Sequence, residues 1–242
     1  MKGKFMLGFD TKHISASDQD ASPALAQMKA AVENAKENNP FVVYEATGHD
    51  LVYAIFDIAK NDEGVHLEKA LGIVGALAGY SCAMSAGLTA EQQDAPKDPA
   101  AHAKRIDHLV FGSNSSLYRV WQSKAVFLGE TKTLDFQELV SRHNAQIGTP
   151  EFGTAKLPQG RFVEEKPITL LLDHWKDMIG ILNRYDEHYA GWPISWAAAG
   201  AQLMEMGQSA IPAGEALQIL LEYAVPMSRV GAADTNSKPE AA

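Results

Sequence analysis

The polar stretch best suited to chemistry runs from residue 173 to residue 188 and reads DHWKDMIGILNRYDEH. His174 and Asp177 are three residues apart within it, so a helix would present both side chains on one face. Imidazole and carboxylate groups bind zinc, but a complete site needs further ligands from other segments. The candidates for those ligands are His66, His108 and His143. Because helical pairs of this kind usually face water, we expect no bound metal and keep His174 and Asp177 as candidate ligand-binding residues.

A second candidate lies just beyond this stretch, where Trp192 and Trp196 begin an apolar helix. The next turns carry small or flexible side chains on one face, at Ala197, Gly200, Ala201 and Met204. Aromatic rings beside a groove of small residues can line a ligand pocket. Aromatic residues at helical spacing more often fill an interior, so core packing is the favoured interpretation and a pocket near Trp192 and Trp196 is the alternative.

Residues 79–83, GYSCA, approximate the G-x-S-x-G nucleophile elbow, and Asp173 and His188 follow in the order of a catalytic triad. An α/β-hydrolase places this elbow among alternating strands and helices, whereas the chain has helical patterns on both sides. We therefore expect Ser81 and Cys82 inside a buried helix, with the Ser81 hydroxyl bonded to a carbonyl one turn back.

Residues 57–68 have the length of a calcium-binding EF-hand loop, with Asp57 at the first position and Glu68 at the last. Ala59 replaces a ligand, and Asp62 stands where the loop needs glycine for its sharp turn. The favoured interpretation is a hairpin turn with solvated acids and no calcium.

The element that must organise the fold is the uncharged segment Leu71–Ala86, LGIVGALAGYSCAMSA. Small residues recur in it at three- and four-residue steps, at Gly72, Gly75, Ala76, Gly79, Ala83 and Ala86. A glycine inside a helix costs roughly 1 kcal/mol against alanine, so the stripe predicts another helix backbone packed closely on Gly75 and Gly79. Residues 70–90 are long enough to span a bilayer, but no Lys/Arg cluster flanks them and Gly, Ser and Thr dilute their hydrophobicity. We expect a buried core helix.

Caps, prolines and apolar stripes predict the other elements. The expected helices cover residues 23–37, 50–60 with Thr47 as the cap, 134–146, 167–185, 194–207 and 212–226. Between residues 106 and 128 strand and helix patterns compete, and a helix is favoured from Ser115 onward. The remaining segments are a short strand at Lys4–Phe9, a solvated linker at 91–100 and an irregular connection at 148–167. The result is an all-α fold, a single mainly helical domain over residues 1–230, irregular in part over 1–20, with a flexible tail at 231–242.

The composition bears on partners and compartment. A net charge of −9 and a pI near 5.3 oppose binding to phosphate backbones, so neither nucleic acid nor an anionic membrane is an expected partner. The single cysteine cannot form an internal disulfide, and residues 1–20 lack the continuous apolar core of a signal peptide. We expect a cytoplasmic protein without a cofactor.

Several phrases of the chain are similar to those of a known family. They are LGIVGALAGYSC (71–82), IGTPEFGTAKLPQG (147–160), Trp192-Pro193, Glu205-Met206-Gly207 and AVPMSRV (224–230). With these phrases the chain resembles a family of uncharacterised bacterial proteins of about this length, over roughly residues 50–230. The resemblance implies a bacterial, cytoplasmic, single-domain protein, and no activity or catalytic residue comes with it.

The absence of a complete catalytic constellation in the sequence favours a non-enzymatic helical protein that binds a protein partner or itself. A homodimer is expected through the helices around Trp192 and through residues 215–227, whose apolar side chains cover most of the helix circumference. The alternative is a metal-dependent or small-molecule enzyme with a pocket near His174, Asp177, Trp192 and Trp196, so whether the protein is an enzyme stays open.

Overall fold

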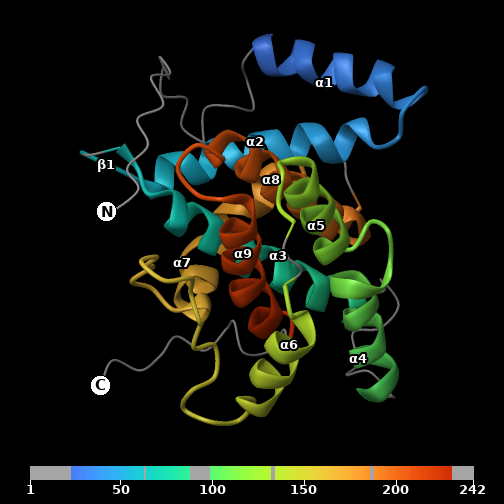
Figure 1. Ribbon diagram of the computed structural model, residues 1–242. Coiled ribbons are helices and arrows are strands. Elements are labelled where there is room, and N and C mark those ends of the chain that lie inside the picture. Colours follow the sequence, from blue (N-terminus) through green and yellow to red (C-terminus); the bar gives the residue numbers. More distant parts are fainter. Residues whose placement is uncertain (1–22, 63, 88–98, 132–133, 186–187, 231–242) are drawn as a thin grey trace.

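The computed structural model describes residues 23–62, 64–87, 99–131, 134–185 and 188–230 (Figure 1). The α-helices are α1 (Pro23–Lys36), α2 (Val42–Ala59), α3 (Leu67–Gly87), α4 (Pro99–Asp107), α5 (Leu117–Phe127), α6 (Phe136–Ala145), α7 (Pro167–Leu182), α8 (Trp192–Gly207) and α9 (Ala213–Met227). A π-helical turn, η2 (His108–Gly112), follows α4, and a 3-10 turn, η3 (Tyr189–Gly191), precedes α8. Strands β1 (Lys60–Asn61) and β2 (Gly64–Val65) form a small antiparallel hairpin between α2 and α3.

These elements confirm the mainly helical, all-α fold. The boundaries of the expected helices agree with the observed ones to within a few residues, except at the start of α2. Helix α4 was not expected, and its first two residues belong to the segment expected to be a linker. The strand expected at Lys4–Phe9, most of the expected linker at 91–100 and the expected tail at 231–242 lie outside the described residues.

Helix α3 runs through the centre of the molecule, and α9 crosses it (Figure 1). A Cβ on Gly75 would lie 2.5 Å from the carbonyl oxygen of Leu220, and one on Gly79 would overlap the carbonyl oxygen of Ala224. Both carbonyls belong to α9, so the two helices pack backbone to backbone, as the glycine stripe predicted. Among the described residues α3 is the one helix long and apolar enough to cross a membrane, and 83% of its apolar window is buried inside the protein.

Helix α2 makes a second close contact, with α8. A Cβ on Gly48 would lie 2.9 Å from the amide nitrogen of Ala199 and 3.0 Å from the carbonyl oxygen of Ser195. Helix α2 therefore begins at Val42, and the cap expected at Thr47 is wrong, because Thr47 is buried inside the helix. A side-chain cap contributes about 1 kcal/mol, less than the packing of an additional helical turn against its neighbours.

Between residues 106 and 128 the helical interpretation is confirmed. Helix α5 follows Ser116, which caps it with its hydroxyl. The indole of Trp121 donates a hydrogen bond of 3.0 Å to a carbonyl of α8, and its ring lies against Gly200. The small-residue face of α8 is thus filled by a tryptophan from α5, while Phe127, whose type suits a strand, ends α5 in solvent.

Residues 146–166 form the expected irregular connection, and ion pairs bind it to the helices beneath. Arg161 contacts Glu68 at 3.2 Å and Glu215 at 2.6 Å, which ties the connection to the first turns of α3 and α9. Lys69 of α3 pairs with Glu165. Strands β1 and β2 form the expected hairpin, but the expectation of solvated acids is wrong at Glu68, which lies in α3 and is paired with Arg161.

Helix α9 is apolar nearly all round, and its side chains from Ala216 to Met227 are almost all buried within one chain. Its neighbours are α3, α5, α6, α7 and α8. The chain itself thus encloses this helix, so its apolar circumference does not require a second subunit. The homodimer stays a prediction, and its interface would have to be formed by surfaces other than α9.

Candidate ligand-binding site

The predicted pair His174 and Asp177 lies on α7, with His174 half-buried and Asp177 exposed. Burial lowers the pKa of His174 below its usual value, and the charge of Lys69 acts in the same direction. The carboxylates of Asp173, Asp177 and Glu165 oppose that shift. The histidine is therefore surrounded by charges of both signs at the edge of α3 and the irregular connection.

The histidines proposed as further ligands lie elsewhere. His66 bonds to Asn61 in the hairpin at 2.6 Å, His143 bonds to Glu222 at 2.9 Å, and His108 belongs to η2. In the described ranges no group of three or more His, Cys, Asp or Glu side chains is placed to hold a metal ion. The folded chain does not add a third ligand to the α7 pair within those ranges.

Trp192 and Trp196 lie in the interior. The ring of Trp192 meets that of Trp175 edge-on, 5.7 Å between centroids, and Trp175 meets Tyr80 of α3 in the same way at 4.7 Å. Trp196 is fully buried. The two candidate tryptophans therefore help to pack α3, α7 and α8 together.

Ser81 and Cys82 are core residues of α3, as expected. The Ser81 hydroxyl donates a hydrogen bond of 2.7 Å to the carbonyl of Ala78, and burial raises the pKa of the Cys82 thiol. Neither side chain is accessible, so the apparent nucleophile elbow is a turn of a buried helix.

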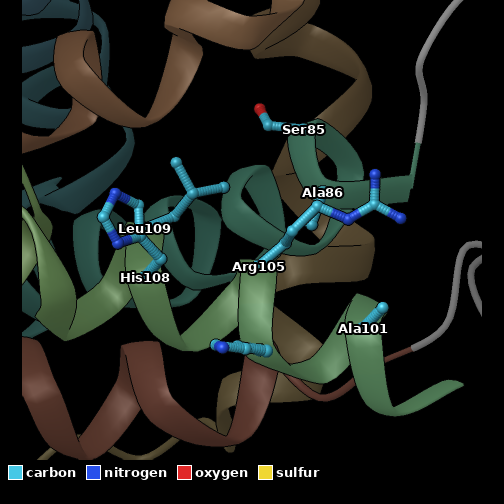
Figure 2. A pocket seen from close by; sticks show the side chains of 7 residues that line it. Ser85, Ala86, Ala101, Arg105, His108 and Leu109 are labelled. Carbon is cyan, nitrogen blue, oxygen red and sulfur yellow. The ribbon is translucent and has the colours of Figure 1, made fainter.

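A hollow of about 540 Å³ opens between the end of α3, helix α4 and the turn η2 (Figure 2). The residues that line it are Ser85, Ala86, Ala101, Lys104, Arg105, His108 and Leu109. Most of its wall is apolar. His174, Asp177, Trp192 and Trp196 do not line it, whereas His108, one of the histidines considered as a further metal ligand, does. The Ser85 hydroxyl already donates to the carbonyl of Tyr189 at 2.8 Å. The hollow thus offers apolar contact with basic groups beside it.

The charge around this hollow differs from that of the whole chain. Lys104, Arg105 and His108 are basic side chains, and no described carboxylate lines the wall. In Figure 2 Arg105 extends from α4 towards Ala86 of α3. A site with these side chains would bind an apolar group and place a negative charge beside the guanidinium.

The π-helical turn η2 continues α4 and supplies two residues to the wall of this hollow. A Cβ on Gly112 would lie 2.9 Å from Nδ1 of His108, so the absence of a side chain lets the imidazole lie back against its own turn. A π-helical turn has more residues than an α-helical turn, so it rotates the residues that follow it around the helix axis. Such turns are frequent at functional sites. His108 and Leu109 reach the hollow from this turn.

A smaller hollow of about 290 Å³ lies between α1 and the end of α7. Arg184 and Tyr185 line it, and both bind the carboxylate of Asp50, at 2.5 Å and 3.0 Å. Burial and the charge of Asp50 raise the pKa of Tyr185. These polar groups already have partners within the chain, which makes this hollow the weaker candidate.

One buried charged cluster was missed by sequence reasoning. The carboxylate of Glu222, on α9, binds Arg142, the His143 ring and the backbone amide of Lys156, the last two at 2.9 Å. Glu222 is a single acid inside the apolar run LQILLEYAV, and that position is the signal that could have found it. The cluster fastens α6 and the irregular connection to α9, and its two central side chains, Glu222 and His143, are buried.

No protein-family model, curated protein or solved structure matches the chain.

Proposed function

We propose that this protein is a non-enzymatic binding protein that holds a small amphipathic molecule in the hollow between α3 and α4. The observation that carries the proposal is the chemistry of the hollow, an apolar wall around about 540 Å³. That volume falls in the range of roughly 300–1,000 Å³ typical of small-molecule sites. Apolar contact would supply the affinity, and the polar groups at the side would orient the molecule.

The groups at the hollow favour binding over catalysis. The Ser85 hydroxyl donates a hydrogen bond to the carbonyl of Tyr189, and no described carboxylate lines the hollow as an acid–base partner. A nucleophile and a base within hydrogen-bond reach of each other are the minimum for covalent catalysis. The enzyme alternative around His174, Asp177, Trp192 and Trp196 has no such pair in support.

A second candidate function is binding of a protein partner, and one surface favours it. Val126 and Phe127 at the end of α5 are exposed, Phe127 to 77%. Lys124 lies 5.2 Å from the centre of the Phe127 ring and pairs with Glu205 at 2.8 Å, so the exposed ring sits among charges. A patch of two side chains is smaller than most interfaces, which makes this the less favoured candidate. The cytoplasm is the proposed compartment for either function, on the composition of the chain.

Calorimetric titration with neutral n-alkanols tests the first proposal. Each added methylene buried from water contributes about 0.8 kcal/mol, so affinity should rise about fourfold per carbon from hexanol to decanol. Ala101→Trp places an indole in the hollow and should abolish binding. Ala103→Trp is the matched control, because Ala103 is also exposed on α4 but does not line the hollow.

Three results would contradict the proposal: no binding of decanol up to its solubility limit, affinity independent of chain length, or equal loss of binding in the two tryptophan variants. Circular dichroism of each variant would establish that it is folded.

A further inference from the structure

We infer that the molecule bound between α3 and α4 carries an oxyanion, a carboxylate or a phosphate, at the end that faces Arg105 and Lys104. The inference rests on the proposed function and adds to it the charge of the ligand. The basic side chains would bind the charged end of the ligand, whereas the apolar wall would contact its hydrocarbon part.

The first support is the local charge. Lys104 and Arg105 belong to the segment 99–112, which contains one acid, Asp107. That acid pairs with Arg229 at 2.6 Å and is therefore already neutralised by a residue that follows α9. A positive site thus stands on a chain whose net charge is −9. Such a site attracts a negatively charged group in spite of the overall charge, because exposed charges beyond about 10 Å are largely screened.

The second support is that Arg105 differs from the arginines that serve the fold. Arg142, Arg161, Arg184 and Arg229 each pair with at least one carboxylate. Arg105 has no carboxylate within ion-pair distance in the described part of the chain, although it lines a hollow. A guanidinium is always charged and presents a planar set of donors that matches the two oxygens of a carboxylate or phosphate.

The third support is the direction of the side chains. Arg105 lies one helical turn after Ala101 and one turn before Leu109, and its side chain extends along Ala86, away from Leu109 and His108 (Figure 2). An amphiphile lying along this face would place its chain beside Leu109 and its head at Arg105. Fatty acids and alkyl phosphates share this chemistry.

The test compares four ligands of equal chain length below their micelle concentrations: decanoate, decyl phosphate, decanol and decylammonium. We expect decanoate or decyl phosphate to bind about fivefold more tightly than decanol, the upper end for an exposed ion pair, and decylammonium to bind least. The advantage over decanol should shrink as salt is raised. The relative affinities of decanoate and decyl phosphate tell which oxyanion is favoured.

Arg105→Gln should remove the preference for the anion, so the ratio of decanoate affinity to decanol affinity should fall from about five to about one. Arg119→Gln is the matched control, since Arg119 is an exposed arginine on α5 away from the hollow. Decanol binding without any anion preference in the unaltered protein would overturn this inference and leave the proposed function in place. Binding of none of the four ligands would overturn both.

An anion preference that persists in Arg105→Gln would also overturn the inference.

Discussion

Addition of a single methyl group at Gly79 tests the central contact of the fold. In Gly79→Ala the new Cβ would lie 2.7 Å from the carbonyl carbon and 2.8 Å from the Cα of Ala224, more than half an ångström inside ordinary van der Waals contact. Both atoms belong to the backbone of α9, so no side-chain rotation can relieve the overlap and the two helices must separate. Overpacking of a rigid core costs about 1–3 kcal/mol and occasionally more.

The gain that alanine brings as a helix former works against this cost. That gain is about 1 kcal/mol. Because the overlap is with backbone atoms, we take the cost at the upper end of the range, about 3 kcal/mol, and expect Gly79→Ala to lower the free energy of unfolding by about 2 kcal/mol net. For a domain of this size that corresponds to a fall of about 4–8 °C in melting temperature. Gly79→Leu should lower it further. Gly180→Ala is the control, because a Cβ at Gly180 on α7 meets nothing within 4 Å and should leave stability equal or raise it.

Differential scanning calorimetry of the two alanine variants, with urea unfolding as a second measurement, gives the comparison. If Gly79→Ala melts at or above the temperature of Gly180→Ala, α3 and α9 do not touch through their backbones and the interpretation of the glycine stripe is wrong.

Four other predictions concern the charged clusters, the subunit mass and the hollow. Glu222→Leu should lower the free energy of unfolding in urea by about 3 kcal/mol, because it leaves Arg142 without its buried partner, whereas Glu138→Gln at an exposed pair should cost less than about 1 kcal/mol. The pKa of His174 is lowered in the folded chain, so the unfolded chain takes up the proton at a higher pH than the folded chain does. The free energy of unfolding should therefore fall as the pH drops below about 6.5. Urea unfolding at a series of pH values measures this, and His174→Asn should make the fall below a pH of about 6.5 shallower. We expect a homodimer, so light scattering in dilute solution should return twice the chain mass of 26.2 kDa. A measured mass equal to that of one chain would show that the prediction of a dimer is wrong. Ala86→Leu should abolish alkanol binding in calorimetry without lowering the melting temperature.

The parts of the fold that could be predicted depend on local pattern. The spacing of Gly75 and Gly79 fixes which face of α3 must meet another backbone, and the prolines at 167, 193 and 212 mark helix starts to within a few residues. The helix start predicted at Thr47 was wrong for the opposite reason. A capping signal is local and contributes about 1 kcal/mol, whereas the contact of Gly48 with α8 joins residues about 150 positions apart and has no local pattern.

The candidate site could not be predicted for the same reason. His174 and Asp177 form a local pair, which is why a helical pattern can detect them, but binding requires a cavity and a cavity is made by segments distant in sequence. The wall of the hollow combines Ala86 with Arg105 and His108, and the chain between them has no pattern that fixes how α4 lies on α3. The stretch HAKRIDH (102–108) shows a local excess of basic residues, and that was the one available signal.

The stripe of small residues on α3 connects the core to the hollow. Two of its members, Gly75 and Gly79, lie under the backbone of α9, where even a methyl group has no room. Its last member, Ala86, is seven residues beyond Gly79 and therefore on nearly the same face, but there it lines the open hollow. Small side chains thus bring two helices together at one end of the stripe and leave space at the other. Gly79→Ala and Ala86→Leu should therefore act in opposite ways: the first removes stability and retains the hollow, and the second fills the hollow and retains stability. If Ala86→Leu is as destabilising as Gly79→Ala, the space beside Ala86 is part of the packed core and the binding site has to be sought elsewhere.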